Sequence, residues 1–180
     1  MSAIEELTRE KLILLIENFA KNWLAHDGLW FQAVEQAHGL EQAMDLDAQA
    51  WRRFSPIEAK RIKAFLGLPE RGGLEALATA LEYRLYAVLN KQQSELKNGR
   101  LRFYMNDCRV QSARKRRGLA DFPCKPVGLV EYSTFATEID PRIRTRCIAC
   151  PPDEHPDEYY CGWEFWIEDE VNRGSQGCAA

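Results

Sequence analysis

The sequence LKNGRLRFYM at residues 96–105 decides the fold. Asn98-Gly99 separates two strand-like runs, and this pair is typical of tight β-hairpins because both turn residues must adopt positive φ. After the turn, apolar and polar residues alternate from Leu101 to Met105, which indicates a half-buried strand. Before it, apolar residues alternate from Tyr83 to Leu89 and polar residues follow. We therefore predict a hairpin whose first arm includes Tyr83–Leu89.

A second hairpin is predicted near the C-terminus. Residues 142–150 and 159–168 read as strands joined by the proline-containing loop 151–158. Two helices are expected between the hairpins, over residues 107–118 and 126–139. The order helices, hairpin, helices, hairpin favours an α+β fold in which a mostly antiparallel sheet of about four strands is covered by helices on one face.

The segment before the first hairpin reads as helical. Apolar residues recur at helical spacing from Leu12 to Trp23, and Asp27 can cap a second helix that ends at Gly39. A third helix follows, and Ser55-Pro56-Ile57-Glu58 resembles a capping box that starts a fourth helix ending at Gly67. A short helix is expected near Leu74–Ala80. We expect a helical region over 1–70, an α+β metal-binding ligand domain over 71–170, and a frayed tail over 171–180.

Composition narrows the class of protein. The chain has 180 residues, a formal net charge of −3 and a sequence pI near 5.7, which give no global reason to expect a nucleic acid partner. No segment approaches the roughly 20 apolar residues that a membrane-spanning helix needs, and the N-terminus does not resemble a signal peptide. We expect a cytoplasmic protein, in which six cysteines indicate metal binding or thiol chemistry rather than disulfides.

Four cysteines of the second half form a candidate metal site. Cys147 and Cys150 form a CxxC motif at a strand end, Cys161 lies early in the next strand, and Cys124 lies at a predicted helix start. Hairpin pairing would bring three of these thiols together, and a helix N-terminus favours a thiolate at the fourth. Four sulfurs suit tetrahedral Zn²⁺, and such a closed coordination sphere indicates a structural rather than a catalytic metal.

Alternatives to the zinc site remain open at this point. An iron–sulfur cluster also uses four cysteines, and buried cysteines without ligand function fit the same pattern. His155, in the loop before Cys161, could replace one sulfur.

Two further sets of residues are functional candidates. Trp30, Phe31 and Glu35 could line an apolar ligand pocket with one polar anchor, although such a stripe is also typical of core packing. Cys108 stands between Asp107 and Arg109 near a predicted helix start, where a lowered pKa would make it a nucleophile; the alternative is a buried helix cysteine.

Four segments carry a resemblance to known proteins: NDCRVQ at 106–111, DFPCKPVG at 121–128, IDPRI at 139–143 and CIACPPD at 147–153. They resemble an uncharacterised bacterial and archaeal cytosolic family related to L-2-amino-thiazoline-4-carboxylic acid hydrolase. The relatives of the hydrolase are similar at Cys108, Cys124 and Cys161 but lack the CxxC motif.

More distantly, the cysteine set resembles that of vinyl-4-reductase-type small-molecule-binding domains. In those domains a similar set holds a structural zinc beside a hydrophobic pocket, with an acid at the position of Cys147. The resemblance implies a binding or sensing module for a small, largely apolar ligand, with a homodimer as a possible assembly. The charge and hydropathy given above predict neither a nucleic acid nor a membrane partner. The competing hypothesis is an enzyme, either a hydrolase of a small cyclic amide-like or thiazoline substrate or a thiol-dependent enzyme that uses Cys108.

Overall fold

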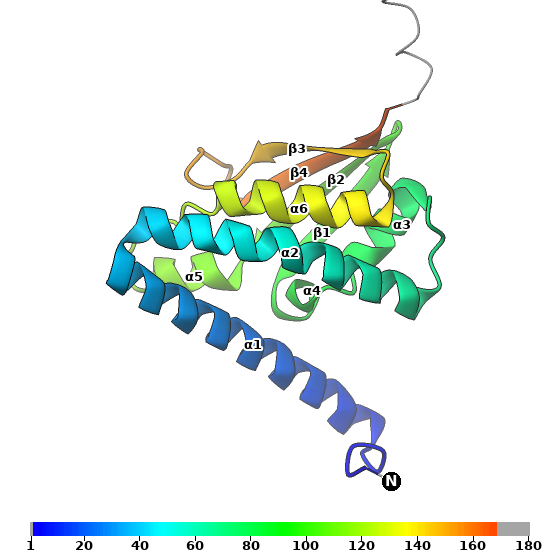
Figure 1. Ribbon diagram of the computed structural model, residues 1–180, viewed down its shortest axis with the longest axis horizontal. Helices are drawn as coiled ribbons and strands as arrows, with labels where there is room; N and C mark the ends of the chain where they lie inside the picture. The colour runs from blue at the N-terminus through cyan, green and yellow to red at the C-terminus, as the bar shows by residue number, and fades with distance from the viewer. Residues whose placement is uncertain (1, 169–180) are drawn as a thin grey trace, which may run out of the picture.

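The computed structural model describes residues 2–168 as a helical layer packed on one face of a four-stranded antiparallel sheet (Figure 1). The sheet has the strand order β1-β2-β4-β3. The elements, in chain order, are α1 (Arg9–His38), α2 (Leu40–Leu66), α3 (Gly73–Leu81), α4 (Leu85–Leu89), β1 (Lys91–Lys97), β2 (Arg100–Asp107), α5 (Arg109–Arg116), α6 (Lys125–Ile139), β3 (Ile143–Ala149) and β4 (Cys161–Ile167). The predicted α+β class and the covered antiparallel sheet are confirmed.

The Asn98-Gly99 turn forms as predicted. Its two residues have φ values of 52° and 69°, and Lys97 pairs with Arg100 on the opposite strand. The prediction for the arm before it is wrong, because Tyr83–Leu89 contains a turn and the short helix α4, and β1 starts only at Lys91. The buried side chain of Arg84 forms ion pairs in the helical layer, which holds this segment away from the sheet.

Alternation along the central strands places the core between the sheet and the helices. Leu101, Phe103 and Met105 of β2 point inward, as do Trp163 and Phe165 of β4, and all five are buried. On the outward face Arg102 and Arg146 flank Glu164 in register and both contact its carboxylate. The inward face therefore meets α6, which lies between the sheet and α2 (Figure 1).

The N-terminal region contains two long helices instead of the four shorter ones predicted. Asp27 lies in the middle of α1 and Ser55 inside α2, so neither residue caps a helix. Pro56 lies within α2 and removes the hydrogen bond that its amide would donate to the carbonyl of Arg52, an exposed residue. The glycine ends are confirmed: Gly39 and Gly67 follow α1 and α2 with positive φ.

The remaining predicted elements are confirmed with small shifts of their ends. These are α3, α5, α6 and the strands β3 and β4. The predicted tail 171–180, with Cys178, lies outside the described residues. Among residues 2–168, no helix combines the length and the apolar character needed to cross a membrane.

Candidate functional site

The four cysteines predicted as a set converge at one end of α6. Cys124 immediately precedes α6, Cys147 lies on β3, Cys150 follows β3 and Cys161 begins β4. The sulfur atoms of Cys124 and Cys150 are 3.6 Å apart, and Cys147 and Cys161 lie close enough to Cys150 to raise its pKa as well. Cys150 is 1% exposed and lies at the centre of this group, which we call the cysteine cluster.

The thiols of the cysteine cluster influence one another's protonation. The contact with Cys150 lowers the pKa of Cys124 and also that of Cys147, while the pKa of Cys150 is raised, first by Cys124 and then by Cys147 and Cys161. Lys125 adds a positive charge that further lowers the pKa of Cys147. Cys124 and Cys147 thus more readily become thiolates, the form that binds metal ions, while the central Cys150 thiol keeps its proton.

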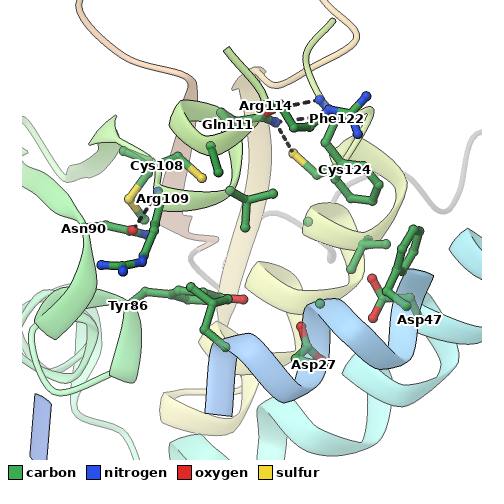
Figure 2. Close-up of a pocket in the computed structure, with 18 of the residues that line it drawn as sticks. Asp27, Asp47, Tyr86, Asn90, Cys108, Arg109, Gln111, Arg114, Phe122 and Cys124 are labelled. Carbon is green, nitrogen blue, oxygen red and sulfur yellow. Dashed lines mark hydrogen bonds between the residues drawn. The ribbon is translucent and has the colours of Figure 1, made fainter. Parts of the chain in front are cut away.

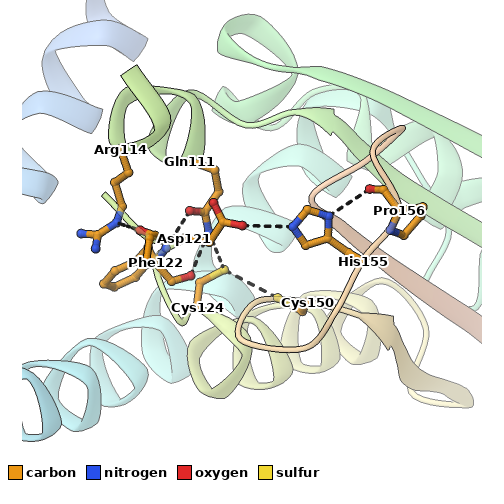
Figure 3. A network of polar contacts seen from close by, with 9 residues as sticks. Gln111, Arg114, Asp121, Phe122, Cys124, Cys150, His155 and Pro156 are labelled. Carbon is orange, nitrogen blue, oxygen red and sulfur yellow. Dashed lines mark hydrogen bonds and ion pairs between the residues drawn. The ribbon is translucent and has the colours of Figure 1, made fainter. Parts of the chain in front are cut away.

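Polar contacts fix Cys124 and the loop after β3 (Figure 3). Gln111, 1% exposed, donates to the carbonyl of Phe122 at 2.9 Å and to the Cys124 sulfur at 3.6 Å, and its own carbonyl accepts from the Phe122 amide at 2.8 Å. Lys125 binds Asp153 at 2.7 Å across the cluster. The contacts of Gln111 fix the segment before α6, and the ion pair of Lys125 with Asp153 links the start of α6 to the loop after β3.

His155 does not join the cysteine cluster. Its Nε2 atom lies 3.1 Å from a carboxylate oxygen of Asp121, and its Nδ1 atom lies 2.9 Å from the carbonyl of Pro156 (Figure 3). The contact with the Pro156 carbonyl and the Asp121 carboxylate raise the pKa of His155. Both ring nitrogens are therefore engaged, Nε2 with the segment before Cys124 and Nδ1 within the loop itself.

The donor chemistry of the cysteine cluster suits a thiophilic metal. Two thiolates on a tetrahedral zinc, each with a Zn–S bond of about 2.3 Å, are separated by about 3.8 Å. The 3.6 Å between Cys124 and Cys150 is close to this value. Within residues 2–168, however, no set of three or more His, Cys, Asp or Glu side chains has the arrangement of a formed metal site.

A cavity of about 730 Å³ lies beside the cysteine cluster. Its walls come from α1, α2, α5 and α6 and from the strands, and Cys108, Cys124, Cys150 and Cys161 all border it. Aromatic side chains contribute much of the lining: Phe31, Trp51, Tyr86, Phe122, Tyr132 and Trp163. A space of this size, with more apolar than polar surface, has the dimensions of a small-molecule site.

The structure separates the three residues proposed for a pocket. Phe31 and Glu35 line the cavity, and Phe31 packs edge-on against Phe122 with ring centroids 5.0 Å apart. Trp30 does not border the cavity and is 68% exposed, because it projects from the opposite side of α1.

Cys108 borders the cavity, but its thiol is not activated. Burial raises its pKa to about 12, whereas a position near a helix start suggested a lowered value. The loss of hydration outweighs the hydrogen bonds from the amides of Val110 and Gln111. The nucleophilic role of Cys108 stays a prediction, and the raised pKa is unfavourable to it.

Sequence reasoning missed the acidic residues of the cavity. Asp27 of α1 and Asp47 of α2 both line it, on the side away from Cys108 and Cys124 (Figure 2). Burial raises the pKa of Asp47 to about 7, with Asp27 and Glu131 adding to the effect, and burial also raises the pKa of Asp27. Their signal in the sequence was an acidic residue within an apolar helical stripe, since Asp27 shares a face with Phe31 and Asp47 with Trp51.

Fold and site together define an α+β domain with a cavity bordered by a cluster of cysteines. The chain belongs to the family of unknown function DUF6125, which matches residues 5–167.

One solved structure with a similar fold is the crystal structure of the phenol-responsive sensory domain of the transcription activator PoxR with phenol. The two chains share 16% sequence identity with a TM-score of 0.52, over 79% of this chain and 73% of that one. No curated protein sequence matches this chain. None of these comparisons supports the expected relation to the thiazoline-carboxylate hydrolases.

Proposed function

We propose that this protein is a binding or sensing module that encloses a small, largely apolar ligand. The observation that carries the proposal is the cavity of about 730 Å³ with its aromatic lining. The solved sensory domain with a similar fold was crystallised with phenol, a small aromatic molecule, which supports a ligand of this class. Apolar contact area drives binding in such a cavity, and a few polar groups set the orientation.

Gly28 offers a way to fill the cavity without damaging the fold. It lies within α1 on the cavity wall, and a Cβ atom built there meets no other atom within 4 Å. Gly28→Leu therefore adds a side chain in open space. Replacing a glycine in a helix interior by a better helix former stabilises the helix by about 1 kcal/mol. Ala37→Leu, at an exposed position of the same helix outside the cavity, is the matched control.

The test measures the binding of phenol and indole by calorimetry and by the shift of the melting temperature. Wild type and Ala37→Leu should bind at least one of the two, with stabilisation that grows with ligand concentration. Gly28→Leu should stay folded and lose about tenfold or more in affinity. Equal binding by Gly28→Leu and wild type would place the ligand elsewhere, and binding of neither compound by wild type would refute an aromatic-binding cavity.

The cysteine cluster is proposed to hold a structural zinc ion. Support comes from the convergence of Cys124, Cys147, Cys150 and Cys161 and from the S–S distance described above. A zinc ion bound there would cross-link the start of α6 to the β3–β4 hairpin. All four ligands would come from the protein, which leaves no open position for water or substrate and favours a structural role.

Zinc content and folding stability test this proposal together. Wild type and Cys108→Ser should each contain about one zinc per chain by elemental analysis. Cys150→Ser should lose most of the zinc, and its melting temperature should no longer depend on added chelator. Iron with visible absorption instead of zinc would favour the iron–sulfur alternative. Metal-free wild type with the same stability in chelator would refute a metal at this site.

A further inference from the structure

Two carboxylates face the cavity from neighbouring helices without a cationic partner. Asp27 comes from α1 and Asp47 from α2 (Figure 2). Within the described part of the chain no cation acts on Asp47, and the charge that acts on Asp27 is that of the neighbouring His26, an exposed side chain. The polar contact of Asp47 is with the indole of Trp51, a neutral group. No cationic side chain of the described residues therefore balances the negative charge that Asp27 and Asp47 carry when they are ionised.

The cationic side chains that border the cavity either form other contacts or are exposed to solvent. Arg114 donates to the carbonyl of Ala120 at 2.7 Å and lies over the ring of Phe122. Lys21 pairs with Glu17 on the outside of α1. Arg109 and Arg117 belong to the α5 side and are exposed to solvent, and Figure 2 shows the Arg109 guanidinium beside Asn90, away from Asp27 and Asp47.

The buried arginine of the helical layer does not compensate the two aspartates either. Arg84 is 2% exposed and lies between Glu58, at 2.8 Å, and Glu131, at 2.7 Å. Glu131 also lines the cavity, and burial raises its pKa. The single positive charge of Arg84 is thus already shared by Glu58 and Glu131, so it does not balance Asp27 and Asp47.

Aromatic rings stand next to this acidic wall. Trp51 and Tyr86 stack with ring centroids 6.0 Å apart, and both line the cavity. Phe31 lies one helical turn after Asp27. Carboxylates beside aromatic faces are surroundings that favour an organic cation, because the rings attract it and the carboxylates accept its hydrogen bonds.

We propose that the cavity selects small aromatic molecules that carry a cationic amine, and that Asp27 and Asp47 bind the ammonium group. This inference rests on the proposed binding function and specifies its ligand class. The ring system of the ligand occupies the apolar part of the cavity toward Trp163 and the cysteine cluster. A neutral alcohol of the same shape keeps the apolar contacts and loses the charge, and a carboxylate of similar shape meets repulsion.

Three indole probes separate these contributions: tryptamine is a cation, tryptophol is its neutral alcohol, and indole-3-acetate is an anion. Calorimetry at pH 7.5 should give wild type a preference of about tenfold or more for tryptamine over tryptophol, with indole-3-acetate weakest. Asp27→Asn and Asp47→Asn should each lose about tenfold in tryptamine affinity and keep their tryptophol affinity within about threefold. Asp45→Asn, an exposed position of α2 outside the cavity, should behave as wild type.

The outcomes distinguish this inference from the proposed function. Equal binding of tryptamine and tryptophol by wild type would overturn the cationic ligand class and leave the binding module intact. Binding of none of the three probes would overturn this inference, and the phenol and indole measurements would then decide the proposed binding function separately. Loss of tryptophol binding in Asp27→Asn or Asp47→Asn, to the same extent as tryptamine binding, would show that the carboxylates shape the cavity instead of binding the amine. Circular dichroism of each variant verifies that it is folded.

Discussion

Replacing Arg84 with methionine should destabilise the protein more than any other single change to a polar side chain. Arg84 donates through Nε to Glu58 at 2.9 Å, and its Nη2 atom lies 2.8 Å from Glu58 and 2.7 Å from Glu131. The contact with Glu131 is an ion pair held by charge, since neither atom has a partner in good hydrogen-bond geometry. The guanidinium also lies within 6 Å of four aromatic rings, those of Trp51, Tyr86, Tyr132 and Phe135.

The magnitude follows from what the substitution leaves behind. Burial acts to lower the pKa of Arg84, but Glu131 and Glu58 outweigh it and raise the pKa, so the guanidinium stays charged. Methionine retains much of the length and the contacts with the rings. Glu58 and Glu131, whose side chains are only 11% and 10% exposed, then lose their counter-charge. Breaking a buried pair in this way costs about 3–5 kcal/mol, a large share of a typical unfolding free energy of about 5–15 kcal/mol.

The loss should depend on pH with a defined sign. Without Arg84, Glu131 loses the charge that offsets its burial, so its pKa in the folded state rises further above the value of about 4.3 that it has in the unfolded chain. The folded variant then binds more protons than the unfolded chain, so its stability falls as pH rises above that value. The difference in unfolding free energy between wild type and Arg84→Met should be smaller at pH 5 than at pH 8.

Urea denaturation followed by circular dichroism at both pH values measures this difference. Arg84→Met combined with Glu131→Gln should recover part of the loss, because one buried charge is removed. A loss below about 1 kcal/mol, or one that is the same at pH 5 and pH 8, would refute the reasoning from buried charge.

Two further substitutions test the packing of α6 and its end. Gly128→Ala should destabilise by about 1–3 kcal/mol in urea despite the better helix propensity of alanine, because its Cβ would lie 2.7 Å from a ring carbon of the buried Trp163; a more stable variant would contradict this. Asp140 is buried and its pKa is lowered to about 2, first by Arg142 and then by amide donors that include Gly73. Asp140→Asn should therefore cost about 2 kcal/mol at pH 7, and the difference from wild type should shrink as pH falls from about 4 toward 2; a difference independent of pH over that range would contradict it.

Local signals predicted the parts of the fold that local geometry determines. Asn98-Gly99 specified its turn because few residue pairs tolerate two positive φ values, and Gly39 and Gly67 ended helices for a related reason. The strands β3 and β4 and the helix α6 followed from apolar periodicity between proline and glycine boundaries. These features need no knowledge of the tertiary structure.

Long-range interactions explain the errors. Arg84 sits within an alternating apolar run that predicts a strand, but its ion pairs with Glu58 and Glu131 place the run among the helices. Ser55 resembles a helix cap, yet it is fully buried inside α2, where its small side chain faces the packed interior. The partners that decide these cases are 26 residues or more away in the chain, so the local pattern does not contain them.

The four cysteines of the candidate site were predicted as a set from the sequence, whereas the acidic residues of the cavity were missed. The set of four cysteines follows from strand pairing, because register brings Cys147 and Cys161 to neighbouring strands next to the same helix start. The cavity depends on how α1 and α2 pack relative to α5 and α6, and no sequence motif determines that arrangement. Asp27 shows the limit clearly, since its residue type suggested a helix cap and its position in α1 makes it a cavity residue.

The two sides of the cavity are anchored unequally. On the sheet side, Cys150 and Trp163 are almost fully buried and belong to the main core, and a metal in the cysteine cluster would fix that wall further. On the other side, α1 spans 30 residues but buries only Ala20, and its residues Asp27 and Phe31 are only partly covered. A ligand therefore adds little to the packing of the sheet and much to the packing of α1. A bound ligand stabilises most the part of the protein that has the fewest contacts without it. We therefore expect the ligand to stabilise α1 more than any other element.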